Sequence, residues 1–157
     1  MTCDQSWTVH EAEQDRDDIR ALLAEHFAAM RAASPPSACH VLPIDGLLGP
    51  EIRFFSLRQD GILLGVGALK LLEPGHGEIK SMRTAASALG QGVGGALLAH
   101  LVATARGIGM TRLSLETGST SDFAAAIRLY DREGFQPCAP FGGYPDTPFT
   151  LFYSRAL

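Results

Sequence analysis

The sequence predicts an α/β fold in which a mixed β-sheet carries helices on its faces. Two observations predict it. Hydrophobic spacings typical of strands and of helices succeed one another along the chain, roughly in the order β-α-β-β-β-α-β-α-β. The chain has 157 residues, of which 46% are hydrophobic and 19% charged, enough to bury one sizeable core. We therefore expect residues 1–157 to form a single domain.

The first half of the chain begins with a strand and a helix. SWTVH, residues 6–10, alternates enough for a short strand, and from residue 15 to 33 apolar residues recur at the spacing of an amphipathic helix. Adjacent prolines end this helix and begin residues 34–50, a loop-rich segment with room for one short helix. The length of this segment makes it a candidate binding flap.

The spacing then becomes that of strands, and later returns to that of helices. Two strands of a hairpin and a further strand are predicted at residues 52–58, 62–72 and 77–84. A glycine-rich stretch, LGQGVGGALLAH, opens a second helix that Gly107 and Gly109 end, with one apolar face made by Val93, Leu97, Leu101, Ala105 and Ile108. The remaining elements are a strand at 112–117, a helix at 123–134 and a strand at 149–155.

Composition excludes several classes of function. The net charge is −4 and the basic residues are scattered, so we expect no binding to nucleic acid or to an anionic membrane. The three cysteines and five histidines show no metal-ligand spacing, so we predict no metal. The start of the chain is polar and acidic, and no apolar run reaches membrane-spanning length. These features favour a cytoplasmic protein.

The glycine-rich stretch can be interpreted in two registers. Gly90, Gly92 and Gly95 spell G-x-G-x-x-G, which marks dinucleotide-binding turns, whereas Gly92 and Gly94 alone spell a shorter G-x-G. Several glycines at a helix start cost backbone entropy. They leave free N–H groups at the positive end of the helix dipole, so we favour phosphate binding over a simple turn.

The dinucleotide interpretation gains support from Glu116, which follows the glycines at about the distance of a ribose-binding acid. Three features oppose it. AASAL separates the glycines from the preceding strand, other strands precede the motif, and too little chain follows Glu116 for a doubly wound sheet. A nicotinamide-dependent oxidoreductase, using NAD(P), therefore stays as an alternative, and the missing G-K-[ST] excludes a Walker A loop.

Three segments in sequence order carry a family resemblance. EIKSMRT resembles the fourth strand of the GNAT superfamily of acetyl-CoA-dependent N-acetyltransferases. GQGVGGALLAHLVATARGIGM resembles its pyrophosphate loop and following helix, and AIRLYDREGF resembles its A-I-x-L-Y-x-x-x-G-F signature. The chain looks like a small bacterial-type, single-domain member. The resemblance implies a mixed, mostly antiparallel sheet with helices on both faces and with splayed fourth and fifth strands.

The resemblance also implies where acetyl-CoA would bind. The pantetheine arm would lie between the splayed strands and pair with main-chain groups of Met82 and Thr84. Backbone amides of the loop would bind the pyrophosphate, and the implied contacts there are Leu89, Gly90, Gln91, Gly92, Val93, Gly94 and Gly95. Leu89 and Phe123 stand where the family often has polar residues. Both changes remove possible polar contacts to the cofactor but leave the amides in place.

Acetyl transfer requires a neutral amine, a polarised carbonyl and a proton for the departing thiolate. The resemblance makes the N–H of Met82 the candidate for polarising the carbonyl and Tyr130 the candidate acid; the alternative for Tyr130 is a packing role. Glu78 and Glu116 are candidate bases, with Glu78 preferred, unless they are only exposed acids at strand ends. An ordinary glutamate would need water or a raised pKa to serve.

The acceptor side is less marked in the sequence. If the strand at 77–84 alternates regularly, Lys80 and Arg83 lie on opposite faces, so that only one could pair with an acidic substrate group. Phe141 and Tyr144 in a proline- and glycine-rich loop are candidates for the pocket wall.

The leading hypothesis is an acetyl-CoA-dependent N-acetyltransferase. It would transfer acetyl directly to the amine of a small molecule or an amino acid-like acceptor. A non-catalytic acyl-CoA-binding protein is a further alternative. Dimers are frequent in the resembling family, which leaves a homodimer open.

Overall fold

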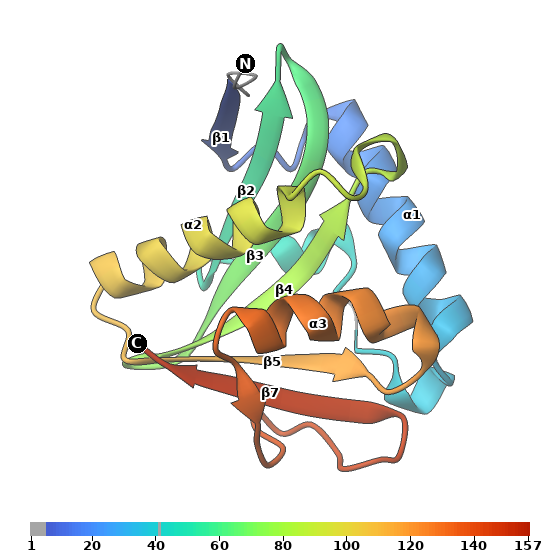
Figure 1. Ribbon diagram of the computed structural model, residues 1–157, viewed down its shortest axis with the longest axis vertical. Helices are drawn as coiled ribbons and strands as arrows, with labels where there is room; N and C mark the ends of the chain where they lie inside the picture. Colours follow the sequence, from blue (N-terminus) through green and yellow to red (C-terminus); the bar gives the residue numbers. More distant parts are fainter. Residues whose placement is uncertain (1–5, 41) are drawn as a thin grey trace.

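The computed structural model, which describes residues 6–40 and 42–157, contains a seven-stranded sheet in the order β1-β2-β3-β4-β5-β7-β6 (Figure 1). Neighbouring strands are antiparallel except for β4 and β5, which are parallel. The strands are β1 Trp7–Glu11, β2 Ile52–Gln59, β3 Ile62–Glu73, β4 His76–Thr84, β5 Arg112–Gly118, β6 Gln136–Pro137 and β7 Thr150–Ala156. This confirms the predicted mixed, mostly antiparallel α/β fold.

Helices cover both faces of the sheet. They are α1 Asp17–Ala33, α2 Val93–Gly107 and α3 Ala124–Arg132, with short 3-10 helices at Pro36–Ala38, Ile44–Leu47, Ala86–Ala88 and Ser121–Phe123. One core cluster joins α2 and α3 to the sheet, and another joins α1 to the sheet through Ile19, Leu22 and Leu23. The sheet therefore has an α1 face and an α2/α3 face (Figure 1).

Small differences from the predicted boundaries have local causes. The segment 34–50 contains two short helical turns instead of one. Ile108 follows the end of α2 and is exposed, because the glycines end the helix just before the next apolar position. The two-residue strand β6 was not predicted, since so short a stretch has no period to detect.

Strands β4 and β5 separate half-way along their length. Their pairing runs only from His76 opposite Arg112 to Ile79 opposite Leu115. Beyond that point β4 pairs with β3 alone and β5 with β7 alone. The splayed fourth and fifth strands expected from the family resemblance are thus present, and the space between them opens in the direction of α3 and the start of α2.

A β-bulge in β4 changes the face that each later residue presents. Ala68 lies opposite Lys80 and Val66 opposite Arg83, so Gly67 faces both Ser81 and Met82. Ser81 has a φ of 55°, in the left-handed region. A side chain at Gly67 would collide with the Met82 sulfur, whose Sδ lies 2.7 Å from the position of its Cβ.

The bulge corrects the expectation that Lys80 and Arg83 point to opposite faces. Val66 and Ala68 both belong to the core cluster under α1, and directly opposed residues share a face. Lys80 and Arg83 therefore both face α1. The regular alternation assumed from the sequence fails because Ser81 inserts one residue between them.

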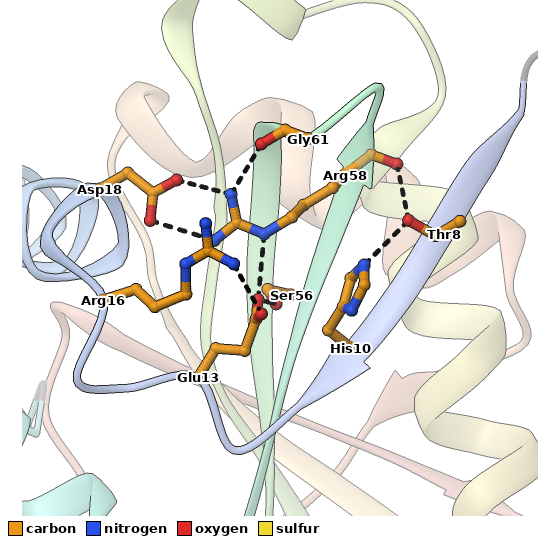
Figure 2. A network of polar contacts seen from close by, with 8 residues as sticks. All are labelled: Thr8, His10, Glu13, Arg16, Asp18, Ser56, Arg58 and Gly61. Atoms are coloured by element: carbon orange, nitrogen blue, oxygen red, sulfur yellow. Dashed lines mark hydrogen bonds and ion pairs between the residues drawn. The ribbon is translucent and has the colours of Figure 1, made fainter.

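A buried arginine joins the first strands to α1 (Figure 2). The side chain of Arg58, 2% exposed, donates to Asp18 over 2.6 and 3.0 Å, to Glu13 over 3.0 Å and to the Gly61 carbonyl over 3.1 Å. Ser56 donates to the same carboxylate of Glu13 over 2.7 Å. The network fixes the N-terminal end of α1 against β2.

Candidate functional site

A cavity of about 450 Å³ lies where β4 and β5 separate. It receives side chains from α1, the segment after α1, β4, β5 and α3, and it extends to the start of α2. Seven of the predicted site residues line it, namely Glu78, Met82, Thr84, Leu89, Gly94, Glu116 and Tyr130. The other five, Gly90, Gln91, Gly92, Val93 and Gly95, are not among the lining residues and lie beside Leu89 and Gly94 at the start of α2.

The first turn of α2 exposes backbone N–H groups at one end of this cavity. Gly90 and Gly92 have φ values of 75° and 85°, which only glycine adopts without strain. Gly92 is the N-cap, and no side chain in the described ranges caps the helix. The N–H groups of Val93, Gly94 and Gly95 precede the first intrahelical bonds, so they are free to bind an anion. This arrangement fits a pyrophosphate.

The two positions that depart from the family pattern lie in different surroundings. Leu89 is 66% exposed at the edge of the cavity. Phe123 is buried, lines the cavity and packs its ring directly on Gly118 at the end of β5. Phe123 therefore replaces a polar side chain with a packing contact, while Leu89 offers an apolar surface where a ligand would enter.

Glu78, Lys80 and Tyr144 form a closed triangle of hydrogen bonds on the α1 side. Lys80 Nζ donates to Glu78 Oε2 over 3.1 Å and to the Tyr144 hydroxyl, and Tyr144 donates to the same Glu78 oxygen over 2.7 Å. Glu78 is 1% exposed and Lys80 8%. Burial, together with the charge and hydrogen bond of Glu78, raises the pKa of Tyr144 far above its usual value. Glu78 is thus a paired carboxylate and not the exposed strand-end acid considered above.

Glu116 lies on β5, across the opening from this triangle. Burial raises the pKa of Glu116 to about 7; the charge of Lys80 lowers it in part, and the charge of Glu78 raises it again. Such a carboxyl group accepts and releases protons near neutral pH.

Tyr130 on α3 is buried, lines the cavity and packs edge-on against Phe135. Burial raises the pKa of the Tyr130 hydroxyl to about 12, so it keeps its proton at neutral pH.

Sequence reasoning assigned no role to three residues that the structure brings to this cavity. His26 on α1, His40 after α1 and Ser81 at the bulge all line the cavity, and His40 packs against the Tyr144 ring with centroids 4.9 Å apart. His26 continues the apolar stripe of α1, and nothing in its spacing separates it from a core residue. The glycine opposite Ser81 was the one available sign of a bulge.

Comparison with known proteins identifies the family. The model of the acetyltransferase (GNAT) family matches residues 12–135, most of the chain. The chain belongs to this family.

Curated relatives bear the same kind of name. An uncharacterized N-acetyltransferase of Bacillus subtilis, YsnE, is 46% identical over 88% of this chain and 92% of its own length. An IAA acetyltransferase of Azospirillum brasilense is 37% identical over 90% of this chain and 92% of its own length. These findings confirm the predicted class of enzyme, an N-acetyltransferase.

Solved structures agree with the fold. A Klebsiella pneumoniae protein described as an acyl-CoA N-acyltransferase has a TM-score of 0.79 at 30% identity and covers 98% of this chain and 99% of its own. A GNAT family acetyltransferase of Elizabethkingia anophelis with acetyl-CoA bound has a TM-score of 0.71 at 20% identity, covering 98% and 99%. The oxidoreductase alternative is not supported, because a mostly antiparallel sheet with one parallel pair is not a dinucleotide-binding fold.

Proposed function

We propose that this acetyltransferase moves the acetyl group of acetyl-CoA directly to the amine of a small acceptor. One observation carries the proposal. The cavity between β4 and β5 connects free amides at the start of α2 with ionisable groups on the α1 side. A donor with a pyrophosphate and a narrow acyl arm fits one end, and an amine fits the other.

The bulge divides the cavity walls between the two substrates. Met82 and Thr84 lie on the α2/α3 side, since Met82 packs on the Gly67 position and Thr84 approaches Gly94. Lys80 and Arg83 lie on the α1 side with Tyr144 and His26. We assign the α2/α3 side to acetyl-CoA and the α1 side to the acceptor.

Three groups supply the chemistry of direct transfer. Glu116 accepts a proton from the ammonium group of the acceptor, directly or through one water, because its raised pKa brings it closer to that of the amine. The neutral nitrogen then bonds to the acetyl carbon as the C–S bond breaks, and it releases a second proton to solvent, from which the Tyr130 hydroxyl is reprotonated after it has protonated the thiolate. The main-chain N–H of Met82 polarises the carbonyl, and Tyr130 donates its proton to the thiolate. Glu78 is held by Lys80 and Tyr144, which leaves Glu116 as the base.

Thiol release from acetyl-CoA, measured with a panel of primary amines, tests the reaction. A thermal-shift assay tests which cofactor binds, because a ligand at a concentration about a hundredfold above its Kd adds about 2.7 kcal/mol to the free energy of unfolding. We expect CoA to raise the midpoint and NAD to leave it unchanged.

The variant Tyr130→Phe should lower kcat while the Kd for CoA, measured by calorimetry, stays the same. Binding of CoA without turnover on any amine would instead favour the non-catalytic acyl-CoA-binding alternative. Absence of CoA binding would refute both.

A further inference from the structure

Several residues that line the cavity carry buried polar atoms without partners. Among the described residues, four buried side-chain atoms have no hydrogen-bond partner, namely Trp7 Nε1, His26 Nδ1, His40 Nε2 and Ser81 Oγ. The last three belong to residues that line the cavity. Buried polar groups are almost always paired, so three such groups in residues that line one cavity are candidates to bond to a molecule held there.

His26 is the most enclosed of the three. It is 7% exposed and lies on the face of α1 that packs against the sheet, one turn beyond Leu22 and Leu23. Burial, with a further contribution from the nearby charge of Arg83, lowers the pKa of His26 to about 4. The imidazole is therefore neutral at physiological pH, and a neutral imidazole with its proton on Nδ1 has one hydrogen bond to donate.

Arg83 adds a positive charge on the same side. The bulge turns its side chain toward α1, and it lines the cavity. No carboxylate of the described residues forms an ion pair with Arg83, whereas the charge of Lys80 is matched by Glu78. A half-buried guanidinium beside a neutral N–H donor is suited to a planar or tetrahedral oxyanion, which it can hold with two parallel hydrogen bonds.

We propose that Arg83 and His26 bind an oxyanion carried by the acceptor, so that the substrate is an acidic amine such as an amino acid or an aminoalkylphosphonate. The inference rests on the proposed function, because it assigns the second functional group of the acceptor. Along β4, Lys80 precedes the bulge and Arg83 follows it. Glu116 on β5 comes directly after the last paired residues, Ile79 and Leu115, and so lies at the level of Lys80. The acceptor would thus be held at two points, with its amine directed to Glu116 and its oxyanion to Arg83.

The phosphates of CoA do not explain Arg83 equally well. The free amides of α2 lie on the α2/α3 face with Thr84, whose hydroxyl is 3.9 Å from the Cβ position of Gly94. Arg83 is the neighbour of Thr84 in a strand and points to the opposite face. Its side chain therefore leaves β4 on the face opposite the one that carries the site assigned to the pyrophosphate.

A panel of matched acceptors tests the inference. Each amine is offered in three forms, as the free amino acid, as its carboxamide and as the corresponding aminoalkylphosphonate, and kcat/KM is measured for each. We expect at least one oxyanion form to exceed the matched carboxamide by about tenfold or more. The preferred form tells whether the natural group is a carboxylate or a phosphonate.

The variant Arg83→Gln should lower kcat/KM for the preferred acidic acceptor by about tenfold or more, chiefly through KM, and leave carboxamides within about twofold. His26→Leu should reduce the same preference by a smaller factor. The Kd for CoA should not change in either variant. Arg106→Gln, at an exposed arginine near the end of α2, is the matched control and should behave as the wild type.

Two results would overturn the inference and leave the proposed function intact. One is equal use of carboxamides and acids by the wild-type enzyme, and the other is a loss in Arg83→Gln that affects both forms alike or that weakens CoA binding. If no amine in the panel is acetylated, the proposed function itself fails, and this inference fails with it.

Discussion

At the scale of residues, the two glutamates of the site differ because of their neighbours. Glu78 accepts hydrogen bonds from Lys80 and Tyr144, so its charge is compensated where it is buried. Glu116 lies near both charges, yet burial dominates and raises its pKa to about 7. Two carboxyl groups on adjacent strands thereby differ in state, one paired in the wall of the cavity and the other, which we propose as the base, with a pKa near neutral pH.

Replacement of Glu116 by Gln should remove the titrating group and keep the shape. In the wild-type enzyme kcat/KM should rise as the pH increases through about 7, because the base acts only when it is ionised. Glu116→Gln should lower kcat by about a hundredfold and lose this rise, as measured by steady-state kinetics from pH 5.5 to 9. A variant that kept the wild-type pH profile would show that Glu116 is not the base.

The same substitution should affect stability in the opposite sense. The folded-state pKa of Glu116 lies above its unfolded value, so the native protein binds the extra proton between about pH 4.5 and 7 and loses stability as the pH rises through that range. Glu116→Gln should therefore be more resistant to urea than the wild type at pH 8. The difference should vanish below about pH 4.5, where the carboxyl group is protonated in both states.

At the scale of elements, the start of α2 combines a special backbone with free donors. Gly92 has a φ of 85° and is the N-cap of the helix, and an added Cβ there would touch nothing within 4 Å. A side chain at this position therefore causes no collision, but it makes the positive φ unfavourable by about 1 to 2 kcal/mol. The loop can avoid this cost by adopting another backbone conformation, which would turn the N–H groups away from a bound anion.

We expect Gly92→Ala to raise the Kd for CoA by about tenfold, measured by calorimetry, while the far-ultraviolet circular dichroism spectrum stays the same. Gly107→Ala, at the other end of α2, is the control. That glycine has open space around it and no positive φ, so the change should leave the affinity for CoA unaltered. If Gly92→Ala and the wild type bound CoA with equal affinity, this loop would not be the site that binds the pyrophosphate.

Sequence patterns predicted most of the elements and named seven residues that line the cavity, for physical reasons that are visible in particular residues. The glycines before α2 and the periodicity of α2 are local in the sequence. They therefore predict the helix and its first residues without knowledge of the rest of the fold. The face of Arg83 could not be predicted, because it depends on a bulge at Ser81 that forms against Gly67 on another strand. His26 falls on the apolar stripe of α1, so its spacing alone predicts a core residue. Its place at the cavity depends on where β4 and β5 separate, which the spacing does not reveal.

At the scale of the whole molecule, the Arg58 network joins the sheet to α1, the helix on the side of the cavity that we assign to the acceptor. The hydrogen bonds from Arg58 hold the pKa of Asp18 below its usual value. Burial alone would raise the pKa of Glu13, but hydrogen bonds from Ser56, Arg58 and Arg16 outweigh it and leave that pKa lowered as well. The hydrogen bonds that Arg58 donates to Asp18 and Glu13 raise the pKa of Arg58 in turn, and the one to Asp18 contributes most.

Loss of Arg58 should therefore destabilise the fold in a pH-dependent manner. Lowered carboxyl pKa values contribute stability above the unfolded-state pKa near 4, and this contribution is lost as the pH falls through the folded-state values. We expect Arg58→Met to lower the free energy of unfolding by about 2 to 3 kcal/mol at pH 7, with a smaller difference at pH 3, measured by urea denaturation.

The control is Arg53→Met. Arg53 pairs with Glu11 over 2.7 Å, but both side chains are about 40% exposed, so this change should cost less than about 1 kcal/mol. Equal losses in the two variants would show that burial of the Arg58 network adds nothing.

The single extra residue at Ser81 has a consequence for how this strand can vary in length. Removal of Ser81 would restore regular alternation and leave every side chain on its present side, because Lys80 and Arg83 would then be two positions apart. A strand of unchanged length that paired without the bulge would instead carry Arg83 to the α2/α3 side and Met82 and Thr84 to the α1 side. Homologues that keep the length of this strand but lack the bulge should therefore recognise different acceptors, even where every individual residue type is retained.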